Sequence, residues 1–205
     1  MKKIDAGIEY KVYDIWNEKI LKVPKNILEI FITHLDWYTE LYFHPIKLIK
    51  KTIYTYKLRE ESTKYIFAHV DKSIFGNIEY QGKNIIQDKV IIGKLYIDHN
   101  PSRVREYCEK YVQQLFELWK YSCSDIHFNF TLNTWINSRN NLIFVDIGEL
   151  SFKKKEVSDF IRSQAWLKWY SYLHELSSDA QTVCRAIFWE KITRQNLEKY
   201  WWEYK

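Results

Sequence analysis

The chain has 205 residues, of which 46% are hydrophobic and 28% are charged. This composition can build a core and excludes an intrinsically disordered chain. Its net charge of +5 comes from lysines spread along the chain, so a concentrated basic surface for nucleic acid is not expected. Three lone cysteines without CxxC spacing, and no uncharged apolar stretch that could span a bilayer, predict a soluble cytoplasmic protein with reduced thiols.

The first part of the chain is expected to contain a β-hairpin, two helices and short strands. Residues 4–23 hold two β-rich runs around a turn at residues 17–19, which is typical of a hairpin. Asn26 is a suitable cap for a helix whose apolar residues recur at helical spacing up to Pro45. A second helix is expected over residues 57–69, and short strands follow it.

The second part is expected to be mainly helical. Apolar residues recur at helical spacing over 104–119, which predicts a long amphipathic helix. The apolar run 142–145 resembles a buried strand, and residues beyond Glu149 are expected to form helices that pack into the core. A β-rich first half followed by a helical second half predicts an α+β fold with two lobes, joined near residues 86–93.

Asn133 and Asp146 are candidate metal ligands. They stand thirteen residues apart, and a hairpin that turns at residues 138–141 would bring them together. Their carboxylate and amide oxygens suit Mg²⁺, which takes one or two protein ligands and completes its shell with phosphate oxygens. The alternative is that Asp146 only starts a turn and Asn133 only caps a loop.

The N-terminal strands carry a second candidate feature. Gly7 precedes a β-rich run through Val12, and Lys22 follows on the next strand, as in a hairpin that covers phosphates while a lysine reaches them. A single lysine in a strand can also be a solvated edge residue. The order of the two signals favours the phosphate-binding interpretation.

In this order the residues resemble the protein-kinase-like fold, in the small atypical branch that includes aminoglycoside phosphotransferases and minimal kinases of the Bud and RIO type. The resemblance covers about residues 4–150. Gly7 and Val12 match the family's glycine-rich loop, although Tyr10 stands where its last glycine usually lies. Lys22 matches the lysine of the V-A-I-K pattern. The sequence VDIGE around Asp146 resembles the D-F-G motif with isoleucine in place of phenylalanine.

The resemblance implies an N-lobe over residues 1–90, a helical C-lobe over residues 91–205, and ATP with Mg²⁺ as cofactors. The carboxylate partner of Lys22 would be Glu61 or Glu60, with Glu40 as the second choice. If it is Glu61, residues 26–45 form an inserted helix. Asn133 and Asp146 would hold the metal. The hinge that binds adenine would be formed by Gln87, Asp88 and Val90.

The expected catalytic loop departs from the family pattern. IHFNFTLN resembles H-G-D-L-x-x-x-N with His127 kept, but Asn129 stands in place of the catalytic Asp and the loop is one residue shorter. An asparagine cannot accept a proton from an attacking hydroxyl, whereas Asp125 could. The alternatives are that Asp125 caps the loop by accepting backbone N–H groups and that His127 is a structural loop residue.

These observations support two functions. The first is an ATP- and Mg²⁺-dependent phosphotransferase that acts on a small molecule or an unusual protein target, since no A-P-E motif follows Glu149. The second is a pseudokinase that binds nucleotide or a partner protein, with its Trp-rich C-terminal tail as a docking element. A metal-dependent nuclease using Asp146, Glu149 and Lys153 is a third interpretation, but the spacing of these residues is not the usual E-x-K. No membrane partner is expected.

Overall fold

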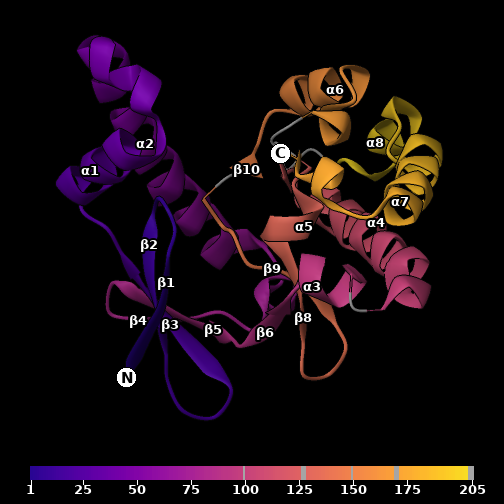
Figure 1. Ribbon diagram of the computed structural model, residues 1–205, viewed down its shortest axis with the longest axis horizontal. Helices are drawn as coiled ribbons and strands as arrows, with labels where there is room; N and C mark the ends of the chain where they lie inside the picture. Colours follow the sequence, from indigo (N-terminus) through magenta and orange to yellow (C-terminus); the bar gives the residue numbers. More distant parts are fainter. Residues whose placement is uncertain (99, 126–127, 149, 169–170, 203–205) are drawn as a thin grey trace.

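The computed structural model describes residues 1–98, 100–125, 128–148, 150–168 and 171–202. It confirms the predicted α+β class: a five-stranded antiparallel sheet lies in the first half of the chain, and helices dominate the second half (Figure 1). Within the described residues, no helix is both long enough and apolar enough to cross a membrane.

The five-stranded sheet has the order β1-β2-β3-β5-β4. The β2–β3 hairpin is where the sequence predicted it, and its turn uses positive φ angles at Asn17 and Glu18. The predicted hairpin region also contains an additional strand, β1, which pairs with β2. The strands of this sheet are β1 (Lys2–Ala6), β2 (Tyr10–Asp14), β3 (Lys19–Pro24), β4 (Glu79–Gln81) and β5 (Asn84–Asp88).

Two helices follow this hairpin. Helix α1 (Ile27–Trp37) begins as predicted after Asn26, but it ends at Trp37 instead of continuing to Pro45, and a 3-10 helix follows it. The Asn26 side chain accepts from Glu29 N at 3.0 Å, and the Glu29 side chain accepts from Asn26 N at 2.9 Å. This reciprocal capping box provides hydrogen-bond acceptors for two backbone N–H groups that have no acceptor within the helix. Helix α2 (Pro45–His69) begins twelve residues earlier than predicted. Proline suits the first turn of a helix, so Pro45 opens α2 instead of only ending the preceding segment.

The second half contains a three-stranded sheet of order β6-β8-β9, a two-stranded sheet of β7 and β10, and most of the helices. The strands are β6 (Val90–Ile92), β7 (Ser124–Asp125), β8 (Thr134–Asn137), β9 (Leu142–Phe144) and β10 (Leu150–Ser151). The helices are α3 (Gly93–Asp98), α4 (Val104–Lys120), α5 (Phe130–Asn133), α6 (Lys154–Arg162), α7 (Ser178–Lys191) and α8 (Arg194–Tyr200). Short 3-10 helices are η1 (Thr39–Phe43), η2 (Lys72–Phe75), η3 (Pro101–Arg103), η4 (Ala165–Leu167) and η6 (Leu173–Glu175).

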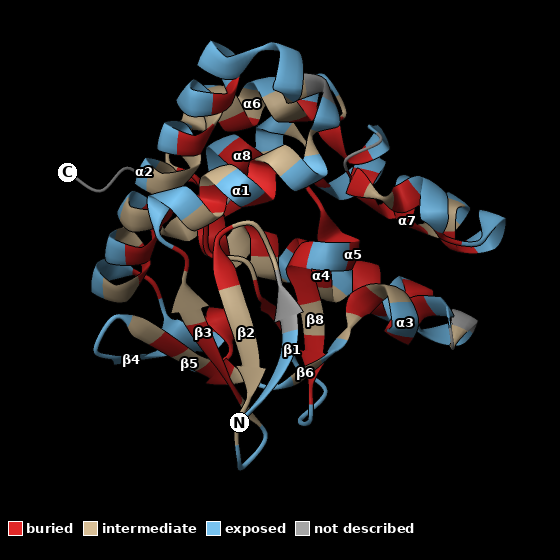
Figure 2. Cartoon of the chain, turned by 60° about the vertical axis from the view of Figure 1, so that its left-hand side comes forward, coloured by how far each residue is buried: buried red, intermediate tan, exposed pale blue. Residues whose placement is uncertain are grey.

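The core centres on α4, whose predicted apolar stripe is buried. Tyr111, Leu115 and Trp119 are completely buried, and they belong to one cluster with residues of α5, α7 and α8. Figure 2 shows the contrast between the buried parts of α4 and α5 and the largely exposed outer turns of α1 and α2. The chain passes from the five-stranded to the three-stranded sheet between Asp88 and Val90, near the predicted boundary. The division into two lobes stays a prediction.

His34 lies buried between α1 and α2 and should make stability depend on pH. Its Nδ1 is 3.1 Å from Thr52 Oγ1. Burial, followed by the nearby charge of Lys51, lowers the pKa of His34 to about 4. In the unfolded chain the imidazole titrates near its ordinary pKa, about 6.5. The unfolded state therefore binds the proton first as pH falls, and stability that is complete above about pH 6.5 is lost down to about pH 4.

We expect urea unfolding at pH 7.5 and pH 4.5 to reveal this effect. The free energy of unfolding of wild type should fall by about 2 kcal/mol more than that of His34→Gln over this interval. Carboxylates that titrate in the same range contribute to both proteins and cancel in the comparison. His174→Gln, which changes an exposed histidine, is the control and should retain the full pH dependence. Parallel pH profiles for wild type and His34→Gln would contradict the prediction.

Candidate functional site

Lys22 on β3 reaches the segment that contains Asp146. Its side chain is only 7% exposed, and its Nζ donates a hydrogen bond to the carbonyl oxygen of Val145. Val12 stands directly opposite Lys22 in the β2–β3 pair, so both side chains lie on one face of the sheet. Two residues of the predicted phosphate-binding region therefore share one face of the sheet, and Lys22 on that face contacts the residue before the predicted metal ligand.

Asn133 and Asp146 both lie next to Val145, the residue that Lys22 contacts. Asn133 ends α5, and its carbonyl oxygen accepts from Val145 N at 2.8 Å. Asp146 is half-buried, and its Oδ1 accepts from Gly148 N at 2.9 Å. Because the β8–β9 pairing returns the chain on itself, the structure brings Lys22, Asn133 and Asp146 together around Val145.

The donor atoms at this point fit Mg²⁺ better than a metal that needs several protein ligands. Asp146 offers a carboxylate and Asn133 an amide oxygen, which are hard ligands. Among the described residues, no group of three or more His, Cys, Asp or Glu side chains could hold a metal. Two ligands suffice for Mg²⁺ when phosphate oxygens and water complete its shell.

Glu9, in the turn between β1 and β2, is a site residue that sequence reasoning missed. It is 7% exposed, and a Cβ added at Gly148 would lie 1.5 Å from Glu9 Oε2. The carboxylate therefore covers Gly148 closely. Gly7 in the same turn is open: a Cβ there would meet no described atom within 4 Å. The turn thus places the Glu9 carboxylate over residues 146–148. It leaves free space around Gly7, the residue that was predicted to belong to a glycine-rich loop.

Tyr10 also belongs to this cluster. Burial raises the pKa of its hydroxyl, and the charges of Glu9 and Asp146 act in the same direction. Its ring centroid lies 5.9 Å from Lys22 Nζ and 5.7 Å from Arg59 Cζ, so the ring faces two cations. No periodic pattern in the sequence marks Glu9 or Tyr10, because their role depends on how the turn folds onto residues 145–148.

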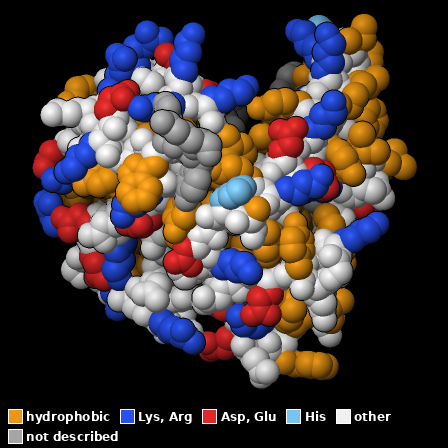
Figure 3. Space-filling view, turned by 180° about the vertical axis from the view of Figure 1, so that it is seen from behind, with side chains coloured by type: hydrophobic (Ala, Val, Ile, Leu, Met, Phe, Trp, Pro, Cys, Tyr) orange, Lys and Arg blue, Asp and Glu red, His pale blue; other side chains and the backbone are white. Residues whose placement is uncertain are grey.

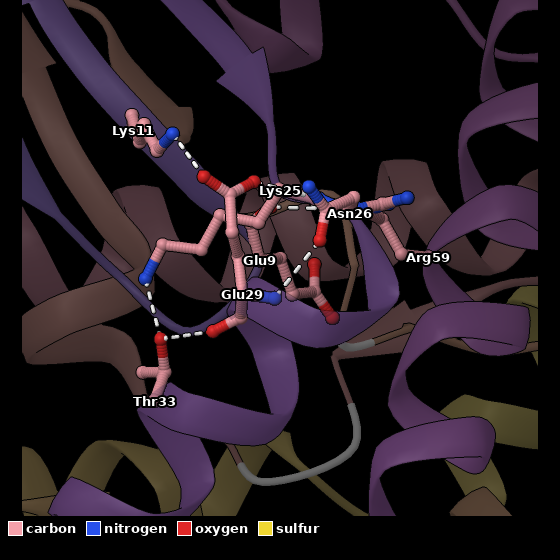
Figure 4. Close-up of polar contacts among 7 residues, drawn as sticks. All are labelled: Glu9, Lys11, Lys25, Asn26, Glu29, Thr33 and Arg59. Atoms are coloured by element: carbon pink, nitrogen blue, oxygen red, sulfur yellow. Dashed lines mark hydrogen bonds and ion pairs between the residues drawn. The ribbon is translucent and has the colours of Figure 1, made fainter.

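Arg59 is the charged residue that α2 presents to the sheet. Its guanidinium donates to the carbonyl oxygens of Glu9 at 3.2 Å and Lys25 at 2.6 Å (Figure 4). It also pairs with Glu60 at 2.7 Å. Figure 4 also draws the ion pair of Lys11 with Glu29 and the hydrogen bond that Lys25 Nζ donates to Thr33 Oγ1. The side chain is 2% exposed, so these carbonyl contacts fix α2 against the β2–β3 hairpin.

Of the predicted acidic partners on α2, neither Glu60 nor Glu61 pairs with Lys22. Glu61 is exposed, because Arg59, Ser62 and Thr63 form the buried face of α2 and place position 61 on the other side. Glu60 is engaged with Arg59. The side chain of Glu40 lies outside the described part of the chain. The expectation that α2 supplies a carboxylate to Lys22 is thus not supported by this arrangement.

The predicted hinge residues lie where the chain passes from one sheet to the next, and some of their polar groups are already used in hydrogen bonds. Gln87 is completely buried, and its Nε2 donates to Phe75 O at 2.9 Å and Phe144 O at 3.1 Å. Asp88 N donates to Gly76 O at 2.8 Å. Val90 pairs with Asn137 in the β6–β8 ladder. The Asp88 N–H is therefore not available to adenine. Strand β6 is at the edge of its sheet, where outward backbone groups could serve instead.

The side chains of Asp125 and Asn129 form hydrogen bonds within the loop that was predicted to be catalytic. Asp125 is 1% exposed, and its Oδ2 accepts from Asn129 N at 3.0 Å and from the Tyr111 hydroxyl at 3.3 Å. Asn129 is the N-cap of α5, and its Oδ1 accepts from Leu132 N at 3.4 Å. These contacts favour the loop-capping alternative for Asp125 and show Asn129 as a helix cap, a role that the sequence did not predict. His127 lies outside the described residues, as does Glu149 of the nuclease interpretation.

We expect Asp125→Asn to affect stability more than any activity. The substitution replaces a charged acceptor in a buried network, which should lower the free energy of unfolding by about 1–3 kcal/mol. Nucleotide affinity should not change, because the side chain faces Tyr111 and the loop backbone. Urea unfolding and a nucleotide titration measure the two quantities. Unchanged stability together with lost ATP turnover would instead identify Asp125 as a catalytic base.

A separate polar cavity of about 380 Å³ lies near the β5–β6 connection. The β2–β3 turn, the β8–β9 turn and Asp88 line it. Asp88 also forms an ion pair with Lys19 at 2.6 Å. The cavity lacks the apolar walls that an adenine ring would need, so it is not the predicted nucleotide site.

No known family model matches the sequence, and no curated protein is significantly similar to it. The kinase-like resemblance therefore stays a prediction that depends on the residues quoted above and on their arrangement around Val145.

Proposed function

We propose that the chain is a kinase-like protein that binds ATP with Mg²⁺ and whose capacity for phosphoryl transfer is impaired, as in a pseudokinase. One observation carries the proposal: Lys22 reaches the backbone beside Asp146, and Asn133 lies next to the same residue. A cation and two residues with hard oxygen ligands thus lie around Val145, in the order that nucleotide phosphates and their metal require. Lys22 would contact the phosphates, and Asn133 and Asp146 would hold Mg²⁺, which would neutralise phosphate charge when bound.

The proposed impairment rests on the loop before α5. Asn129 cannot accept a proton, and Asp125 is buried and uses its Oδ2 to hold that loop, which makes it a poor catalytic base. A slow phosphotransferase is the second candidate function. It is favoured by Glu9, whose carboxylate lies against Gly148 and could accept a proton near the metal ligands. A low level of transfer needs mainly positioning and charge stabilisation.

A thermal-shift titration with ATP and Mg²⁺ tests the proposed function. If ATP is present at about 100 times its dissociation constant, it should stabilise the folded state by about 2.7 kcal/mol. For a chain of this size that corresponds to a rise in Tm of roughly 5–10 °C. Lys22→Met and Asp146→Ala should lose most of this rise.

Lys94→Met is the matched control, because Lys94 pairs with Glu175 in the helical half and should not affect nucleotide binding. No shift of wild type at millimolar ATP would reject nucleotide binding. An equal shift in wild type and Asp146→Ala would remove the metal from the proposal. Production of ADP by a wild type that also shows the shift would favour the phosphotransferase over the pseudokinase.

A further inference from the structure

An apolar groove lies between α1 and α2, and none of its lining residues belongs to the candidate nucleotide site. Its volume is about 260 Å³. Its walls are apolar apart from Thr52, which is buried and bonded to His34. The lining residues are Ile27, Leu28, Phe31, Ile49, Thr52 and Ile53.

The groove is part of a larger exposed apolar surface. Leu28 is 63% exposed and Ile49 is 49% exposed, and the surface continues to Ile46 at 69% and Phe43 at 86%. In Figure 3 hydrophobic side chains gather along the upper right arm, which α1 and α2 form. A contiguous apolar surface of this kind is unusual on a monomer and indicates an interaction site.

On the α2 side of the groove the charges of the first half of the helix have one sign, whereas α1 carries Glu29 and Asp36. Residues 45–58 contain four lysines (47, 50, 51 and 57) and no acidic residue. Three of them lie in the first two turns of α2, next to the positive end of the helix dipole, where cations destabilise a helix. Lys51 packs over the Tyr38 ring, whereas Lys50 and Lys57 are exposed. These lysines lower the stability of the helix that contains them, which suggests that they are present for a function.

Helical spacing places these lysines next to the apolar stripe. Positions 46, 50, 53 and 57 succeed one another at intervals of four, three and four residues, so they share one side of α2. A ligand seated in the groove would therefore have apolar contacts along its centre and ammonium groups along its α2 edge. This pattern complements an amphipathic segment with acidic flanks.

We propose that the α1–α2 groove binds an amphipathic helix of a partner protein, with the apolar face of that helix in the groove and acidic side chains facing Lys50 and Lys57. A concave, dry groove suits a helix that inserts anchors at i, i+3 or i+4, and i+7. A lipid surface would instead favour a convex apolar face. The 11 residues of α1 extend over about 16 Å, which accommodates about three turns of the partner.

The test is a selection of peptides from a displayed library of randomised 15-residue helices against the full chain. Selected peptides should share apolar residues at helical spacing and acidic flanks. Their affinities, measured by fluorescence anisotropy, should fall at least tenfold in Ile49→Glu/Ile53→Glu. Lys50→Glu/Lys57→Glu should also weaken binding and reduce its dependence on salt. Ile91→Glu is the matched control, because Ile91 is 55% exposed on β6 and far in sequence from the groove.

Several outcomes would overturn the proposal. These are recovery of no binding peptide, selection of basic flanks, and equal binding to Ile49→Glu/Ile53→Glu. Binding of phosphatidylserine vesicles that needs the groove residues, with no peptide binding, would identify a membrane surface instead. A dimer of wild type that Ile49→Glu dissociates would identify a second copy of the chain as the occupant. All substituted side chains are exposed, so unchanged Tm values would show that each variant is folded.

Discussion

A chain that ends at Leu176 is expected to be insoluble or molten, because the segment it lacks completes the main core. Helix α7 packs against α4, where the Phe188 ring lies 5.4 Å from Tyr111, and it also meets Phe130 of α5 edge-on at 4.8 Å. Helix α8 stacks Tyr200 on Phe116 at 4.5 Å. The buried apolar residues that the truncation removes are Ala180, Cys184, Ile187, Phe188, Ile192, Leu197 and Trp201.

The expected loss exceeds what a protein of this size can tolerate. Burial of one large apolar side chain stabilises a fold by about 1.5–3 kcal/mol. The residues removed therefore contribute on the order of 10 kcal/mol, which is comparable with the whole free energy of unfolding of a typical domain, about 5–15 kcal/mol. Truncation would also expose the apolar face of α4 to water.

Near-ultraviolet circular dichroism and binding of a hydrophobic dye would detect a molten product. Two point variants calibrate the result. Phe188→Ala removes a completely buried ring and should cost about 3–5 kcal/mol. Trp189→Ala removes its neighbour, which is 62% exposed, and should change stability by about 0.5 kcal/mol or less. Cooperative unfolding of the truncated chain would show that the C-terminal helices are a separable docking tail.

The sequence predicted the features that depend on neighbouring residues. The Asn26 cap needs only the residues that follow it, and the turn at Asn17 and Glu18 needs only its own backbone. The apolar stripe of α4 follows from helical periodicity alone. The meeting of Asn133 and Asp146 beside Val145 was also predictable, since a short hairpin connects them.

Other features depend on tertiary contacts that leave no local pattern. Arg59 faces the sheet and Glu61 faces solvent because packing fixes the rotation of α2, and both residues suit an exposed helix equally well. In the sequence, an aspartate that caps a loop looks the same as a catalytic base, because both are carboxylates. Only the burial of Asp125 beside Tyr111 distinguishes the two roles. Glu9 gained its place over Gly148 from the fold of the β1–β2 turn, which no spacing rule describes.

Gly93→Ala adds only one methyl group, and we expect it to destabilise the fold more than other substitutions of that size. Gly93 begins α3 where this helix passes β8 and α4. A Cβ there would lie 1.8 Å from Tyr107 Oη and 2.6 Å from the carbonyl oxygen of Thr134. The second atom belongs to the backbone of β8, so a side-chain rotation cannot relieve the overlap.

Displacement of Tyr107 would lower the free energy of unfolding further. Its ring is completely buried, and its hydroxyl lies 2.9 Å from Phe130 O and 2.6 Å from Thr134 O. Overpacking costs about 1–3 kcal/mol, and a buried hydrogen-bonding group left without its partner costs about 1–3 kcal/mol more. We therefore expect a loss of about 2–6 kcal/mol in the free energy of unfolding. A shift of Thr134 would also move the adjacent Asn133 and weaken any nucleotide binding there.

Chemical denaturation of Gly93→Ala and Gly7→Ala makes the comparison direct, because a Cβ at Gly7 meets no described atom within 4 Å. Gly7→Ala should be neutral or should stabilise the fold by about 0.4–1 kcal/mol through the lower entropy of the unfolded chain. Tyr107→Phe removes the overlapping oxygen, so the double variant Gly93→Ala/Tyr107→Phe should be less destabilised than the sum of its single changes. Equal, small effects of the two alanines would mean that α3 does not approach β8 as closely as the structure shows. Strict additivity would mean that the Tyr107 hydroxyl is not what makes glycine necessary at position 93.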